Sequence, residues 1–129
     1  MRRSAPHKQS GQAMVELAIV LPILIILVLG IIQFGIVYKN QLALTDAVRV
    51  GARQAAVSRE APDPVGNAEG AVRTAAADLN QSDLNVSVSS SWVQGEDVTV
   101  SATYPYELNI FGLVVKSGSL TSETTERVE

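Results

Sequence analysis

A glycine and a carboxylate stand at the start of the longest apolar run in this chain. Gly11 is followed five residues later by Glu16, and no charged side chain occurs over the 22 residues 17–38. The glycine is preceded by three basic residues, Arg2, Arg3 and Lys8. An ionised group at the edge of a membrane-length apolar segment is costly unless it is paired, and such groups are functional candidates. Glu16 is therefore the residue whose chemistry most needs a partner.

The sequence offers little else that could do chemistry. It has no cysteine, and its one histidine, His7, lies near the N-terminus. Nucleophile–base pairs and His-rich or thiolate metal sites therefore cannot be built. No glycine-rich phosphate loop precedes a helix, and the acidic pair Glu96-Asp97 lies at an expected turn. We predict no enzyme activity, no cofactor, no metal and no small-molecule substrate.

The charges are distributed unevenly along the 129 residues. Residues 1–59 carry seven basic and two acidic residues, whereas residues 60–129 carry three basic and eleven acidic ones. An acidic domain repels phosphate backbones, which argues against nucleic-acid binding. Basic residues flank the apolar run on both sides, so charge counting alone leaves its orientation in a membrane open.

The apolar run predicts a transmembrane helix. About 20 apolar residues suffice to cross a bilayer, and we assign residues 12–38 to the span. The run is longer than the apolar core of a typical signal peptide. Pro22 lies inside it, and a proline removes a backbone donor and clashes with the preceding turn, which predicts a kink. Residues 1–11 lack an apolar period and are expected to be disordered.

The helix is predicted to continue outside the membrane over residues 39–60. Apolar residues recur there at helical spacing and form a stripe of mostly small side chains: Leu44, Ala47, Val48, Gly51, Ala52 and Ala55. Another element can approach such a stripe closely. We expect one helix of about 45 residues that ends before Pro62.

Residues 61–129 predict a small α+β domain. Asp63 before Pro64 fits the N-cap and first turn of a second helix that runs to about Leu79. After it, apolar and polar residues alternate over 86–92 and 98–104, which predicts a hairpin. A third strand is expected around 119–128. The predicted fold is thus α+β: a long N-terminal transmembrane and stalk helix, a second shorter helix and a small three-stranded antiparallel sheet.

Residues 108–115, LNIFGLVV, form a second apolar segment. It is too short to span a membrane, and we interpret it as a surface loop. Three roles stay open for it: it covers the sheet, it rests on the first helix, or it is a patch that binds a partner.

Residues 9–57 resemble the TadE-like minor pilins of the tight-adherence (Flp, type IVc) pilus. Prepilin signals of this class have a short basic leader, then Gly, with Glu as the fifth residue of the mature chain. The resemblance implies that 1–11 is a prepilin leader and that a prepilin peptidase cleaves between Gly11 and Gln12. The proline and the Gly-Ala-Arg of the family match Pro22 and residues 51–53, while Leu17 stands where the family often has Phe.

The same resemblance implies a role for Glu16 and a location. In related pilins the equivalent carboxylate is thought to meet the new N-terminus of a neighbouring subunit, which would fix the register of assembly. The expected protein is a bacterial inner-membrane, single-pass minor pilin or pseudopilin with a cytoplasmic N-terminus and an extracytoplasmic C-terminal domain. Its partners would be the peptidase, other pilin subunits, the pilus assembly platform and membrane lipid.

Three other readings stay open. The chain could be an envelope component of the secretion apparatus that never enters the filament. It could be a membrane-tethered binding domain that uses residues 108–115. It could also be an ordinary signal anchor in which Glu16 is incidental.

Overall fold

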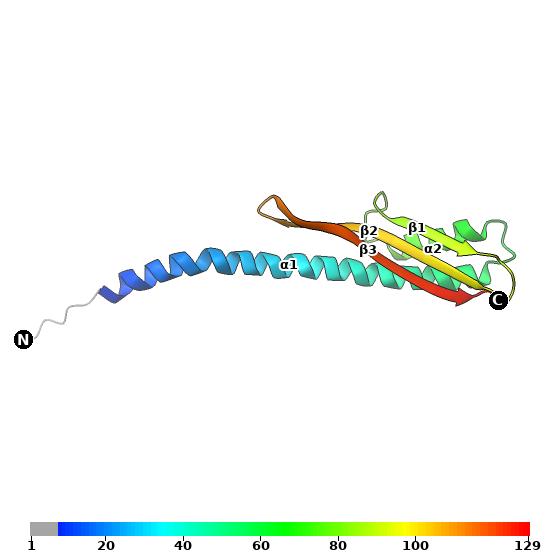
Figure 1. Cartoon of the computed structure of the whole chain (residues 1–129), viewed down its shortest axis with the longest axis horizontal. Coiled ribbons are helices and arrows are strands. Elements are labelled where there is room, and N and C mark those ends of the chain that lie inside the picture. Colours follow the sequence, from blue (N-terminus) through cyan, green and yellow to red (C-terminus); the bar gives the residue numbers. More distant parts are fainter. Residues whose placement is uncertain (1–7) are drawn as a thin grey trace, which may run out of the picture.

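A computed structural model describes residues 8–129, and its elements confirm the α+β class. The chain forms a long helix, a second short helix and three strands (Figure 1): α1 (Lys8–Val57), α2 (Pro64–Ala75), β1 (Asn85–Ser90), β2 (Asp97–Ile110) and β3 (Leu113–Arg127). The strands make one antiparallel sheet in the order β1-β2-β3.

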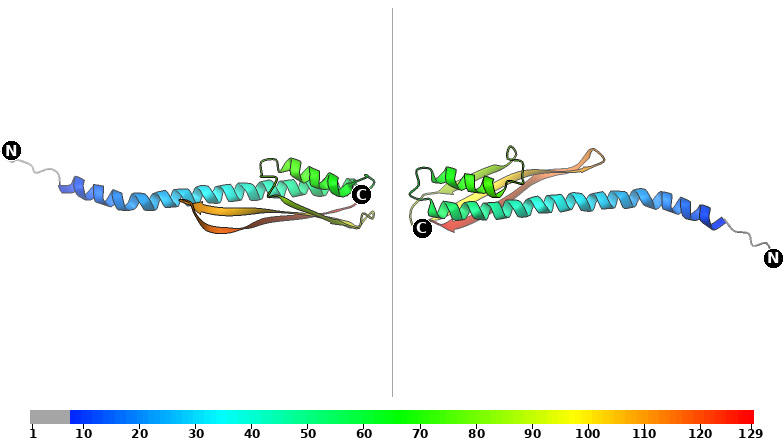
Figure 2. Two further views of the ribbon diagram at one scale, coloured as in Figure 1. Left: turned by 90° about the horizontal axis from the view of Figure 1, so that it is seen from above. Right: turned by 180° about the vertical axis from the view of Figure 1, so that it is seen from behind.

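The elements form two layers at one end of α1. The short helix α2 lies beside the C-terminal half of α1 (Figure 2), and the sheet packs across both, with β2 and β3 on α1 and β1 on α2. The N-terminal half of α1 extends far beyond these layers, so the start of α1 and the C-terminus lie at opposite ends of the described structure (Figure 1).

Helix α1 is continuous over 50 residues and includes Pro22. It begins at Lys8, so the expectation that residues 8–11 lack structure was wrong; residues 1–7, with Arg2, Arg3 and His7, lie outside the described residues. Once a helix is nucleated, each added residue gains a hydrogen bond, which lets the apolar helix extend into this polar segment.

The core forms where the small-residue stripe of α1 meets the other elements. Leu44, Ala47, Val48, Ala52 and Ala55 are fully buried. They pack with Ala68 and Val72 of α2 and with Val98 and Val100 of β2. Burial of these apolar surfaces against water is the main force that holds the two layers together.

Gly51 is the position at which α1 approaches α2 and β2 closely in this core. A Cβ atom at this position would overlap Val72 Cγ2 of α2 and would lie 3.2 Å from the carbonyl oxygen of Ala68 and 3.5 Å from Val100 Cγ1. The glycine therefore allows one position of α1 to touch a second helix and the sheet at once.

The second helix begins as predicted and ends earlier. The Asp63 side chain accepts a hydrogen bond from the Gly66 backbone nitrogen at 2.8 Å, and Pro64 occupies the first turn. The helix ends at Ala75 rather than near Leu79 because the next residues form a turn, in which Ala76 and Leu79 are nevertheless buried.

Strands β2 and β3 are longer than predicted, and the interpretation of residues 108–115 as a loop was wrong. Strand β2 runs through Ile110, β3 starts at Leu113, and only Phe111 and Gly112 connect them. Pro105 lies within β2. β1 pairs with β2 only as far as Thr103, so the continuation of β2 has a free edge, where a proline is tolerated.

The C-terminal tail closes the end of the domain away from the N-terminus. Val128 is buried and exchanges backbone hydrogen bonds with the turn between β1 and β2, through Gly95 at 2.9 Å and Glu96 at 2.8 Å. The Glu129 backbone nitrogen donates to the Ala56 carbonyl at 3.0 Å. The tail therefore links β3 to the end of α1.

We predict that Gly51→Ala lowers the free energy of unfolding by about 1–3 kcal/mol, because the added methyl group overpacks the contact with Val72 and Ala68. The measurement is the urea midpoint of the full chain in detergent micelles, followed by the fluorescence of Trp92, the single tryptophan. Gly70→Ala on α2 is the matched control. Its Cβ would meet nothing within 4 Å, so its higher helix propensity should stabilise the domain by about 0.5–1 kcal/mol. Equal effects of the two substitutions would contradict the close-approach argument.

Candidate functional site

The residues that the sequence singled out for processing lie together near the N-terminal end of α1. Gly11, Gln12 and Glu16 are all exposed, and a Cβ at Gly11 would meet no atom within 4 Å. The Gln12 Nε2 atom donates a hydrogen bond to Glu16 Oε1 at 3.2 Å. Residues 12 and 16 are one helical turn apart, so a chain that began at Gln12 would have its α-amino group about 6 Å along the helix from Glu16.

The apolar run that follows is uncovered by the rest of the protein. None of the most apolar window of α1 is buried within the described residues, and α1 is long and apolar enough to cross a bilayer. Large apolar side chains such as Ile19, Ile23 and Phe34 are each more than 60% exposed. α1 is therefore a candidate membrane anchor, since such a surface is stable only against lipid or other apolar helices.

Pro22 lies in the middle of this uncovered run. The helix continues on both sides of it, and Figure 1 shows that the N-terminal half of α1 is gently curved. A sharp kink at Pro22 stays a prediction.

The opposite half of α1 presents the small-residue stripe of residues 44–55 to its own domain. Ala47, Val48, Gly51, Ala52 and Ala55 all face inward and are buried. These residues therefore join the anchor rigidly to the domain.

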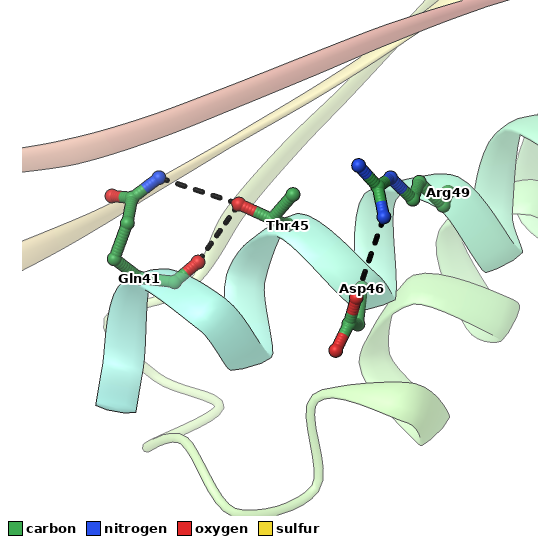
Figure 3. A network of polar contacts seen from close by, with 4 residues as sticks. All are labelled: Gln41, Thr45, Asp46 and Arg49. Atoms are coloured by element: carbon green, nitrogen blue, oxygen red, sulfur yellow. Dashed lines mark hydrogen bonds and ion pairs between the residues drawn. The ribbon is translucent and has the colours of Figure 1, made fainter. Parts of the chain in front are cut away.

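Polar side chains of this half make two local contacts, a part-buried one between Gln41 and Thr45 and an exposed one between Asp46 and Arg49 (Figure 3). The Thr45 hydroxyl donates to the Gln41 carbonyl at 2.9 Å, and Arg49 Nη1 lies 3.9 Å from Asp46 Oδ1. Both charged side chains are about 70% exposed or more, and such surface pairs contribute little to stability. Arg49 and Arg53 are thus part of a solvated face of the helix.

One residue of the site went unassigned in the sequence: Gln33, the only strongly polar side chain of the apolar run. Its Nε2 atom donates to the Asn109 carbonyl of β2 at 2.9 Å. The regular pairing of β2 with β3 is interrupted by a register shift between Leu108 and Asn109, at the residue that accepts this hydrogen bond. The sequence does indicate that Gln33 needs a partner, because a polar group in an apolar helix must be hydrogen-bonded within the protein. No spacing rule indicates that this partner lies 76 residues further along the chain.

The described residues contain no group of three His, Asp or Glu side chains that could hold a metal ion. The candidate site consists of one carboxylate, Glu16, and the long exposed apolar face of α1.

Comparison with known proteins gives a family match for the N-terminal part of the chain. The sequence model of the family described as TadE-like protein matches residues 11–53. No curated protein and no solved structure matches the chain. The match begins at Gly11, covers the uncovered apolar run and ends inside the small-residue stripe. Over residues 11–53 the chain is therefore similar to TadE-like proteins, which suggests a protein associated with the Tad pilus.

Proposed function

We propose that the chain is a minor pilin or pseudopilin that is inserted in the membrane, processed, and used in the assembly or initiation of a Tad (type IVc) pilus. The observation that carries this proposal is the position of the family match. It starts at Gly11, where the basic leader ends, and Glu16 follows at the fifth position of a chain that begins at Gln12.

Processing would occur at an accessible peptide bond. Gly11 and Gln12 are exposed, and a Cβ at Gly11 would meet no atom within 4 Å, so a prepilin peptidase could reach this bond from the cytoplasmic face. Residues 1–11 would then remain in the cytoplasm and the two-layered domain would lie outside the inner membrane.

Cleavage would create the partner that Glu16 needs. A new α-amino group appears at Gln12, and the same group of a neighbouring subunit offers an ammonium to the exposed Glu16 carboxylate. In surroundings of low dielectric an unpaired carboxylate is strongly unfavourable, so pairing would select one register between adjacent helices. The exposed apolar face of α1 would supply the lateral contacts with other pilin helices.

The C-terminal half of α1 and the domain packed on it would form one rigid unit. The buried stripe and the tail contact at Ala56 hold α1, α2 and the sheet together. A subunit added to a helical stack through α1 would therefore carry its acidic domain in a fixed orientation at the periphery.

We expect Gly11→Ala to block processing. Wild-type protein from its native membrane should have lost residues 1–11 by intact mass, and the variant should retain them. The comparison is clean because a Cβ at this position meets no other atom, so the substitution leaves the fold unchanged. An uncut wild-type chain, or a cut beyond the apolar helix, would contradict the proposal and leave a plain signal anchor.

Glu16→Ala should leave processing intact and remove the subunit from filaments, because the variant lacks the carboxylate that sets the register. The readout is the amount of the protein in sheared filaments relative to the membrane, with Glu60→Ala at the far end of the stalk as control. Normal incorporation of the Glu16 variant would refute the role of this carboxylate. If processed wild-type protein stays in the membrane and never appears in sheared filaments, the chain is an envelope component of the apparatus.

A further inference from the structure

We infer that the tip of the β2–β3 hairpin, residues 108–115, is a second membrane contact of this protein. It would enter the lipid interface beside α1, in the leaflet from which the domain emerges. This goes beyond a role in pilus assembly and depends only on α1 being the membrane anchor.

The first argument is the position of the tip along α1. The Gln33 side chain holds the Asn109 carbonyl, and Gly30, Gln33 and Phe34 of α1 line a groove of about 280 Å³ together with Leu108, Ile110, Val115 and Lys116 of the hairpin. The first charged residue after the apolar run is Lys39, six residues beyond Gln33. At 1.5 Å per residue the tip thus lies about 9 Å below the polar end of the span. Figure 1 shows the hairpin turn beside α1, well before the region covered by α2 and β1.

The second argument is the surface of the tip. No charged residue occurs between Glu107 and Lys116. Phe111 is 70% exposed and Leu113 73%, and Val114 and Val115 are also more than half exposed. Val115 lines the groove beside the uncovered face of α1, and exposed apolar side chains gathered in this way would be an aggregation-prone patch in water.

The third argument is the backbone at Phe111. Its φ is 52° and that of Gly112 is 80°, so both central residues of the turn are in the left-handed region. Such two-residue turns favour Asn, Asp or Gly at the first position, and a bulky residue there is strained. The exposed ring of Phe111 packs little against the protein core. Backbone strain that packing does not explain points to a contact outside the chain, and an aromatic ring suits the lipid interface.

The charged residues on either side of the tip, Glu107 and Lys116, agree with a position at the lipid interface. Lys116 follows the apolar residues, pairs with Leu108 across the hairpin and lines the groove. A lysine at this level can extend its stem along apolar surface and place its ammonium among lipid phosphates. Glu107 is farther from the turn and exposed, so the acidic side chain remains on the water side.

The depth is limited by the backbone. Beyond Thr103 the hairpin has no third strand, so each strand has a free edge with unpaired backbone groups. Open edges are excluded from the hydrocarbon core but are tolerated at the headgroup boundary, where water is present. The hairpin therefore dips into the interface and does not cross the bilayer.

The test uses the absence of cysteine in the chain. A single cysteine is introduced into the full-length protein at one of three positions: Leu113→Cys, Ser117→Cys or Thr121→Cys. Each variant is labelled with a nitroxide and placed in nanodiscs that hold one copy of the protein. Successive positions are about 13 Å apart along the strand. Collision rates with oxygen report lipid, and those with a soluble nickel chelate report water. Gln94→Cys, in the turn between β1 and β2, is the aqueous control.

We expect the ratio of oxygen to nickel collisions to be several-fold higher at position 113 than at 94, and to fall through 117 to 121. Adding Phe111→Asn should abolish most of that excess at 113, because the ring is lost. Asparagine tolerates the positive φ, so the urea midpoint read by Trp92 should not decrease.

Two outcomes would overturn the inference. Nickel access at 113 equal to that at 94 would place the tip in water. Low access to both reagents would mean that protein covers the tip, either this chain or a second copy. The experiment needs neither peptidase nor filaments, so its failure is distinguishable from failure of the pilin proposal.

Discussion

The structure depends on the close packing of α1 against α2 and β2 around Gly51. All other elements are placed by this contact: α2 approaches because position 51 has no side chain, and the sheet then covers the two helices together. Small residues on a helix usually serve close approach between backbones. Here they let one continuous helix be both the candidate membrane anchor and the central element of the folded domain.

A single helix thus faces two kinds of surroundings. Its N-terminal half exposes apolar side chains in every direction, whereas its C-terminal half buries a stripe of them against the domain. The hairpin β2–β3 spans the change between the two, through Gln33 with Asn109 at 2.9 Å and Gln41 with the Thr121 carbonyl at 3.3 Å. These two contacts tie the sheet to the helix on both sides of the boundary marked by Lys39. The residues around Lys39, where the apolar run ends, are consequently held in place by the sheet.

Much of this architecture could be predicted from the sequence, because local periodicity carries it. The stripe of residues 44–55, the Asp63 cap and the alternation over 98–104 each depend on neighbours within a few positions. The hairpin tip was misread for physical reasons. Pro105 suggests an end of the strand, and the two-residue turn has Phe where such turns favour Asn or Gly. The partner of Gln33 could not be predicted, since no local pattern encodes a contact across 76 residues.

The tail contact at Ala56 has a consequence for the timing of folding. The buried face of α1 is completed by residues near position 128, and Gln41 finds its β3 partner only 80 residues later in the chain. Any process that delivers the polypeptide from its N-terminus therefore releases α1 long before its covering strands exist. During that interval the buried stripe around Gly51 has no covering residues, so its close contacts with α2 and β2 can form only after the later elements have been delivered.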